Sequence, residues 1–155
     1  MNNNITPAHV TYEQAVWLKS IGFDLPCNKM YGIDASLEYF DNSYGAGSLY
    51  RNSFNVDFIT AAPEQSVVVE WLRVNFQVNV TYTVEVIGSD EWRYGYMICY
   101  LPFGFWSEKR RSIHFQTVYS FCEVGSSYTG AWDSPSEAIS AALSYLMSNE
   151  IIKQK

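Results

Sequence analysis

The sequence predicts an α+β fold, in which a three-stranded or larger antiparallel sheet has two or three helices packed on one face. Three observations lead to this prediction. Residues 78–100 contain two runs of alternating polar and apolar residues, joined by a short turn. One amphipathic pattern of helical period precedes these runs, and another follows them. The length of 155 residues, with 48% hydrophobic and 17% charged residues, is typical of one globular domain, which we expect to span residues 1–155.

The first predicted element is a helix that opens at Thr11. Its apolar residues recur at helical spacing, and Gly22 comes just after the last of them, at the position where glycine commonly ends a helix. The predicted stripe consists of Tyr12, Ala15, Val16 and Lys19, with Leu18 and Ile21 beside it.

The next part of the chain, residues 24–60, is irregular and has the character of an insert in the domain. Residues 29–40 predict a strand or a hairpin, because apolar residues are spread along them. Residues 41–55 are rich in Gly, Ser, Asn and Tyr and predict a loop, and residues 56–59 predict a short extended piece. No change in composition is sharp enough to mark a domain boundary here.

Residues 63–150 form the predicted core, in the order helix, strand, strand, strand, helix. Pro63 predicts the first turn of the first of these helices, because a proline there leaves no intrahelical hydrogen bond unmade. Glu70 and Arg73 have the spacing of a surface ion pair on a helix. The apolar residues at helical spacing are Val67, Val68, Trp71, Leu72 and Val74.

The two alternating runs predict a β-hairpin with one buried face. A three-residue turn between them sets a register in which paired residue numbers add to 178. That register places Val84 opposite Tyr94 on the apolar face, and Glu85 opposite Arg93 on the other face. A slip of one residue would set apolar against polar residues along the whole hairpin, so this register is favoured.

A third strand and a last helix complete the predicted core. The strand begins at Ile113 and ends at Gly125, and its apolar residues are Ile113, Phe115, Tyr119 and Phe121. The helix opens with Ser134-Pro135-Ser136-Glu137, which is a capping box with proline at the first helical position. Its apolar stripe comprises Ala138, Ala141, Ala142, Tyr145 and Leu146.

Three segments carry a resemblance through their order and spacing. They are Thr11–Phe23, then Ala62-Pro63 leading into Val69–Arg73, and then Ser134–Ala138 leading into Ala141–Tyr145. Together they resemble small uncharacterised proteins found in phages and prophages of gut Bacteroides and their relatives. The resemblance covers most of the chain apart from residues 24–60. It implies a phage-associated origin, and that group has no assigned activity to carry over to this chain.

Charge and hydropathy limit the classes of partner. Sixteen acidic against ten basic residues give a net charge of −6, and a chain of that charge repels phosphate backbones, which argues against nucleic acid as a partner. No stretch has the length and apolar character of a membrane span, and the N-terminus has no signal-peptide pattern. We therefore expect a cytoplasmic protein of the host cell that has no membrane partner.

The sequence contains no pattern that predicts catalysis. Its two histidines, His9 and His114, are far apart, and His9 falls in an N-terminal segment that we expect to be mobile. The three cysteines, Cys27, Cys99 and Cys122, have wide spacings, so we expect free core thiols rather than a disulfide framework or a zinc site. No nucleophile, metalloprotease or phosphate-loop motif is present. The sequence thus predicts no enzyme, no metal and no cofactor.

Binding is the remaining chemistry, and the aromatic content of 17% indicates it. Aromatic residues that the core cannot hold could form a contact patch, the alternative being a sheet face packed under the helices. A basic cluster with aromatic neighbours could hold a phosphate or stack a base, the alternative being a solvated turn. The candidate binding residues, all in predicted loops, are Trp106, Lys109, Arg110, Arg111, Tyr128 and Trp132.

Two classes of function remain open. The first is a non-enzymatic binding protein, phage-encoded as the resemblance implies, that acts on a host or phage protein or associates with itself as a homo-oligomer. The second is a protein that binds a small ligand or a nucleotide and sequesters it with the Lys109–Arg111 loop. We expect the first class, because a compact acidic domain with surplus aromatic residues and no catalytic motif favours protein contact.

Overall fold

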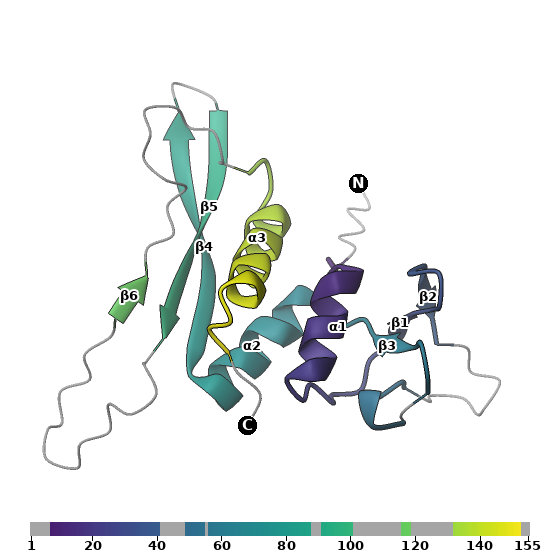
Figure 1. Ribbon diagram of the computed structural model, residues 1–155. Coiled ribbons are helices and arrows are strands. Elements are labelled where there is room, and N and C mark those ends of the chain that lie inside the picture. Colours follow the sequence, from purple (N-terminus) through teal and green to yellow (C-terminus); the bar gives the residue numbers. More distant parts are fainter. Residues whose placement is uncertain are drawn as a thin grey trace, which may run out of the picture. The chain divides into compact units, whose positions relative to one another are not determined.

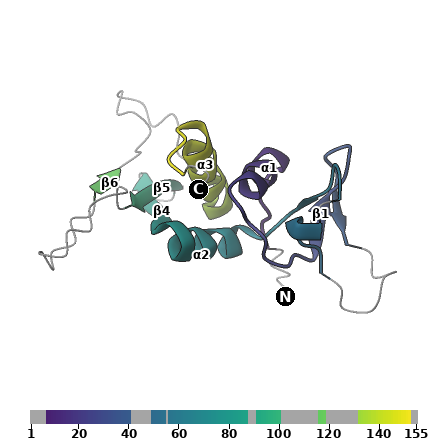
Figure 2. The ribbon, with the colours of Figure 1, turned by 60° about the horizontal axis from the view of Figure 1, so that its bottom comes forward.

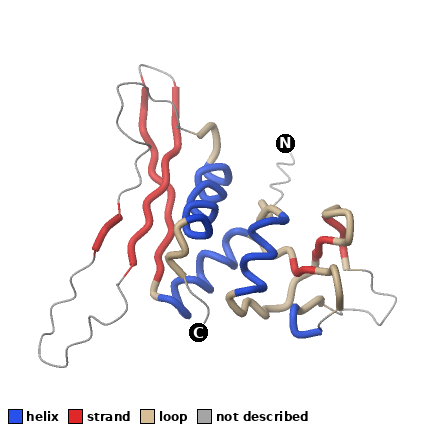
Figure 3. Tube along the Cα trace, in the orientation of Figure 1, coloured by secondary structure: helices blue, strands red, loops and turns tan. Residues whose placement is uncertain are grey.

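The computed structural model describes residues 7–40, 49–54, 56–87, 91–100, 116–118 and 132–152. These residues form an α+β fold with three α-helices and two antiparallel sheets of three strands each, which confirms the predicted fold class (Figures 1 and 3). The chain divides into two compact units. The first contains Met1–Val67 and Ser144–Lys155, and the second contains Val68–Leu143. The single domain over residues 1–155 stays a prediction.

Helix α1, Tyr12–Ser20, begins where the sequence predicts, because a capping box fixes its N-terminus. The Thr11 hydroxyl accepts a hydrogen bond of 3.3 Å from the Gln14 N–H. In return, the Thr11 N–H donates a hydrogen bond of 3.1 Å to the side-chain oxygen of Gln14. Two N–H groups at this helix end are therefore satisfied within the chain.

Helix α1 also ends as predicted. Gly22, just after the C-cap Ile21, has a φ angle of 91°. The Gly22 N–H donates to the Lys19 carbonyl at 3.2 Å, and the Phe23 N–H donates to the Leu18 carbonyl at 2.9 Å. This pair of bonds is the Schellman motif, which needs a left-handed residue and so favours glycine. Phe23 and Leu18 are both buried, so an apolar contact accompanies the motif.

The buried face of α1 differs from the predicted stripe. It consists of Gln14, Ala15 and Leu18, whereas Val16 is 42% exposed. The sequence pattern favoured Val16 because it is apolar, but Gln14 takes the buried position. Burial of this polar residue is possible because its amide donates a hydrogen bond of 3.0 Å to the Ser144 hydroxyl.

The first sheet has the order β2-β1-β3, with β1 at Lys29–Tyr31, β2 at Leu37–Tyr39 and β3 at Thr60–Ala61. Strands β1 and β2 form a hairpin, which decides between the two predictions for residues 29–40. The extended piece predicted at residues 56–59 is wrong. The chain turns there, with the Ile59 N–H donating to the Val56 carbonyl at 3.3 Å and Phe58 at a φ of 64°. An aromatic residue rarely takes this left-handed conformation, so the local sequence does not indicate the turn.

The loop predicted over residues 41–55 is described only in part. Residues 41–48 and 55 lie outside the described residues. Asn52–Phe54 form a short 3-10 helix, so the part that is described is more regular than expected.

Backbone and side-chain hydrogen bonds hold this segment in the first unit. Tyr50 and Cys27 exchange a pair of backbone hydrogen bonds of 2.9 Å. The buried Asn52 side chain donates to the Phe23 carbonyl at 2.8 Å and accepts from the Ala61 N–H at 3.0 Å. Both ends of its amide are thus satisfied, which a buried polar side chain requires.

Helix α2, Gln65–Phe76, begins two residues later than Pro63 predicts. The segment before it pairs with the N-terminal part of the chain. The Val10 N–H donates to the Pro63 carbonyl at 3.2 Å, and His9 forms an antiparallel bridge with Glu64. The prediction that His9 is mobile is therefore wrong, because a long-range contact that no local pattern reveals holds this residue.

Helix α2 buries a narrow stripe of its predicted apolar residues. Val68 and Leu72, four residues apart, are fully buried. In contrast, Val67 is 37% exposed and Val74 is 63% exposed. Because four residues make about one helical turn, the buried pair marks the face of α2 that packs in the core.

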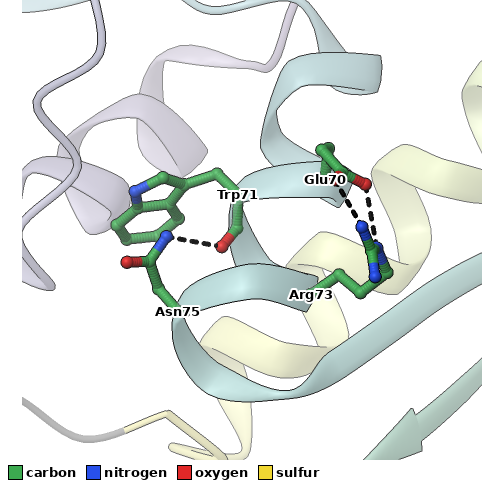
Figure 4. A network of polar contacts seen from close by, with 4 residues as sticks. All are labelled: Glu70, Trp71, Arg73 and Asn75. Carbon is green, nitrogen blue, oxygen red and sulfur yellow. Dashed lines mark hydrogen bonds and ion pairs between the residues drawn. The ribbon is translucent and has the colours of Figure 1, made fainter.

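The surface of α2 carries the predicted ion pair (Figure 4). Arg73 donates to Glu70 through Nη2 at 2.5 Å and through Nε at 2.9 Å. These hydrogen bonds lower the pKa of the Glu70 carboxyl. The Asn75 side chain donates to the Trp71 carbonyl at 2.9 Å in the same view. Both partners of the ion pair are more than half exposed, so water screens it and it adds little to stability.

The second sheet has the order β4-β5-β6, with β4 at Val78–Ile87, β5 at Glu91–Tyr100 and β6 at Gln116–Val118. The ten pairs between β4 and β5 all have residue numbers that add to 178, which confirms the predicted register. Strand β6 pairs antiparallel with β5 and lies within the third strand predicted from Ile113 to Gly125. The remainder of that prediction falls outside the described residues.

Helix α3, Pro135–Ser148, begins at its predicted cap. The Glu137 N–H donates to the Ser134 hydroxyl at 3.3 Å. The Glu137 carboxylate accepts a hydrogen bond of 3.1 Å from the Asp133 N–H, one residue before the cap. The buried residues of this helix are Ala138, Ala142, Leu143 and Leu146.

The two faces of the β4–β5 hairpin differ in burial. On the even-numbered face, Val78 and Val80 are each 3% exposed and Ile98 is fully buried, whereas Asn79 on the other face is exposed. One end of the even-numbered face is therefore covered, and Figures 1 and 2 show α3 alongside the hairpin. No helix in the described part of the chain is long and apolar enough to cross a membrane.

Candidate binding surface

Most of the candidate binding residues lie outside the residues that the structure describes. These are Trp106, Lys109, Arg110, Arg111 and Tyr128. The same is true of His114 and Cys122. The basic loop, and with it the nucleotide-binding alternative, therefore stays a prediction.

Trp132 is the candidate residue that the structure describes, and it does not lie in a free loop. Its N–H and carbonyl exchange two hydrogen bonds of 2.9 Å with Tyr94 of β5, which makes an isolated antiparallel bridge. Its ring centroid is 5.4 Å from that of Tyr96, with the rings tilted by 40°. Trp132 thus lies beside β5 on the edge away from β4, and its side chain is half-buried.

An ion pair links the residue after Trp132 to the same strand. The Arg93 guanidinium contacts the Asp133 carboxylate, while the register places Glu85 of β4 opposite Arg93. The Asp133 side chain is 81% exposed, so this pair contributes at most about 1 kcal/mol to stability.

The even-numbered face of the hairpin is buried at one end and open at the other. Val78 and Val80 are each 3% exposed, whereas Tyr82 is 47% exposed and Val84 is 45% exposed. All four residues belong to one strand and one face, so the apolar surface of the core continues past the part that the helices cover. Figure 1 shows the hairpin extending beyond the N-terminal end of α3.

We call four residues at the open end of this face the hairpin patch: Tyr82 and Val84, which are exposed, and Tyr94 and Trp132, which are half-buried. Val84 and Tyr94 are opposite each other in the register. The rings of Tyr82 and Tyr94 form an edge-to-face pair with centroids 6.0 Å apart. The bridge from Trp132 to Tyr94 adds the indole to the same group. The patch therefore brings the predicted binding residue Trp132 together with three residues of the hairpin face, whose aromatic residues the sequence left open between a packed core and a contact patch.

The lengths of the strands and helices indicate that one end of this face stays uncovered. Each hairpin strand has ten residues and spans about 33 Å at about 3.3 Å per residue. Helix α3 has 14 residues and spans about 21 Å, and α2 has 12 residues and spans about 18 Å. A helix lying along this hairpin leaves about a third of its length uncovered. The sequence alone could have predicted an exposed end.

Titratable groups elsewhere in the described residues do not form a metal site. No group of three or more His, Cys, Asp or Glu residues among them is placed to hold a metal ion. Cys27 and Cys99 are free thiols; Cys27 is buried, as expected, whereas Cys99 is only half-buried. Burial, with a smaller contribution from Glu64, raises the pKa of the Cys27 thiol to about 11. This thiol is therefore protonated at neutral pH and is a poor nucleophile.

The hairpin patch consists of two tyrosines, a tryptophan and a valine, which makes it a candidate contact surface. Aromatic side chains with a polar tip suit such a surface, because they bury a large apolar area and keep a hydrogen-bond donor.

Comparison of this chain with protein-family models, with curated proteins and with solved structures finds no match.

Proposed function

We propose that this chain is a non-enzymatic binding protein that takes another polypeptide against the hairpin patch. The observation that supports the proposal is the exposure of Tyr82 and Val84, at 47% and 45%, on a face whose other end is core. An apolar face that continues from the core into solvent is typical of a protein contact site. Tyr and Trp are also the residue types that most often anchor such contacts.

Other exposed apolar residues favour this function less. Phe58 is 72% exposed and Tyr39 is 70% exposed, both in the first unit. The ring of Tyr39 already contacts the Lys29 ammonium, 4.8 Å from its centroid. The hairpin patch differs because its members contact one another and join a buried face, so a partner would extend an existing core.

The binding energy of the patch can be compared with what a complex needs. Complete burial of a large apolar side chain contributes about 1.5–3 kcal/mol, so Tyr82 and Val84, about half exposed, would each add about 1 kcal/mol. A micromolar complex requires about 8 kcal/mol. The aromatic anchors Tyr94 and Trp132, together with backbone hydrogen bonds, must supply the rest.

The class of partner follows from the charge and the resemblance. The net charge of −6 disfavours nucleic acid and favours a polypeptide. A phage-associated origin, which the resemblance implies, makes a host protein, a phage protein or a second copy of the chain the natural partner. Each of these would act in the cytoplasm of the host cell.

The test compares a patch variant with a matched surface variant. Tyr82→Ser combined with Val84→Ser removes the apolar surface of the patch, and Val74→Ser changes a residue that is 63% exposed on α2. Tagged chains are used to capture partners from the host, with the native mass and melting temperature of each variant measured alongside. We expect a polypeptide that wild type and Val74→Ser retain and the patch variant loses. The same set of partners for all three, with equal melting temperatures, would contradict the proposal.

A further inference from the structure

The outer edge of strand β4 offers a second means of contact beside the hairpin patch. In the sheet order β4-β5-β6, β4 is an edge strand of ten residues. Within the part of the chain that the structure describes, no strand pairs with this outer edge. Such an edge presents a row of backbone donors and acceptors that a further strand can use.

The pairing of β5 shows which residues of β4 face this edge. Tyr94 exchanges both of its backbone hydrogen bonds with Trp132, so its N–H and carbonyl point away from β4. Val84, opposite Tyr94, therefore directs its own N–H and carbonyl away from β5. Because this pattern alternates along a strand, the outward-facing residues are Val78, Val80, Tyr82, Val84 and Val86.

The sequence of β4 lacks the features that natural proteins use to block an edge. It contains no proline, lysine or glycine, and Glu85 is its one charged residue. The Tyr82 carbonyl, which faces outward, accepts a hydrogen bond from the neighbouring Thr81 hydroxyl only at the long distance of 3.4 Å. A long, regular edge strand of this kind is a template for pairing with another strand.

We propose that a second copy of this chain pairs with β4 in antiparallel orientation and joins two β4-β5-β6 sheets into one. The inference rests on the function proposed above, since it names the second copy as a polypeptide that reaches the hairpin patch from its Tyr82 and Val84 side. A register centred on Tyr82 pairs all five outward-facing residues among themselves and forms about ten backbone hydrogen bonds. That number matches the roughly ten direct hydrogen bonds of a typical protein interface.

The same register is complementary to itself in charge and in side-chain type. Glu85 lies opposite Asn79 of the second copy, so no like charges meet. Thr81 lies opposite Thr83 of the second copy, and Tyr82 lies opposite its own counterpart. Threonine pairs and aromatic pairs are among those that stabilise sheets. A shift by one residue would set apolar against polar residues, so the register is specified by the same rule that fixes the hairpin.

The test measures the mass of the chain in solution by sedimentation velocity, from micromolar to submillimolar concentrations. We expect wild type to reach twice the chain mass of 17.7 kDa. Thr81→Lys places a charge at the edge on the face opposite the hairpin patch, close to the same lysine of the second copy. It should raise the dissociation constant at least about tenfold. Thr81→Val, which is neutral and β-branched, is the matched control and should pair as wild type does.

Two outcomes would overturn the inference. One is a wild-type chain that stays at 17.7 kDa at the highest concentration. The other is a Thr81→Lys chain that associates as wild type does. If Thr81→Lys melts at a lower temperature than wild type, amide hydrogen exchange of wild type replaces it as the test. Exchange at the Val84 N–H should slow as the chain concentration rises. An exchange rate that does not change with concentration would overturn the inference. The capture experiment with the Tyr82 and Val84 variant remains a separate test of the proposed function.

Discussion

Two adjacent valines of α2 allow a sharp test of how this helix packs. Val68 is fully buried and Val67 is 37% exposed, so Val→Ala makes the same chemical change in two environments. At Val68 the loss of two methyl groups costs about 1.6 kcal/mol in transfer energy, and the cavity raises this to about 2.5 kcal/mol. Alanine returns about 0.5 kcal/mol through its higher helix propensity at either position. We therefore expect Val68→Ala to lower the free energy of unfolding by about 2 kcal/mol, and Val67→Ala by about 0.5 kcal/mol or less.

The assay is denaturation by urea, with every variant at one chain concentration, because self-association would make stability concentration-dependent. A loss of about 2 kcal/mol in a chain of 155 residues lowers the melting temperature by about 4–8 °C. Equal losses at the two valines would refute the orientation of α2 about its axis. A larger loss at Val67 would place the opposite face of the helix in the core.

Three further changes test the other parts of the fold. Ser134→Ala removes the cap of α3 and should lower the free energy of unfolding by about 1 kcal/mol. Leu146→Ala, at a fully buried site, should lower it by about 2–5 kcal/mol. Equal and negligible losses of both variants in urea denaturation would show that α3 is misplaced. Burial raises the pKa of Cys27 from its ordinary value of 9.0 to about 11, and a raised pKa in the folded state favours the neutral thiol. The stability that this thiol contributes should therefore be complete below about pH 9 and decline as the pH rises through about 11. The decline in the free energy of unfolding should be smaller in Cys27→Ala than in wild type. Identical pH profiles for wild type and Cys27→Ala would contradict the burial of this thiol.

The accuracy of the sequence predictions depended on the range of the interactions behind them. The hairpin register was predicted for all ten pairs, because the alternation of residue types and the turn length are local and admit one solution. The caps at Thr11 and Ser134 were also predicted, since each uses residues within one turn of the helix.

The errors arose where distant residues decide the local structure. Helix α2 starts after Pro63 because the extended segment before it pairs with Val10 and His9. On α1, Gln14 is buried and Val16 is exposed, because the hydroxyl of Ser144, far along the chain, accepts a hydrogen bond from the Gln14 amide. Neither contact has a signature in the sequence around the affected residue.

The candidate site was predicted only in part. Trp132 was identified from its residue type, but its ring packs against that of the buried Tyr96, so truncation of the Trp132 side chain should lower the stability of the fold as well as the affinity for a partner. For the face that contains Tyr82 and Val84, core packing and a contact patch both stayed open, because alternation identifies the apolar face but not how much of it the helices cover. The lengths of the strands and helices carry that information.

Photo-crosslinking in cells tests most directly whether the hairpin patch is a contact surface. A photoreactive phenylalanine replaces Tyr82, which is 47% exposed in the patch, or Val74, which is 63% exposed outside it. The account predicts a defined covalent adduct from position 82 and none from position 74, with a mass of twice 17.7 kDa if the partner is a second copy. Adducts of equal yield at both positions, or none at position 82 in a normally folded chain, would contradict the account.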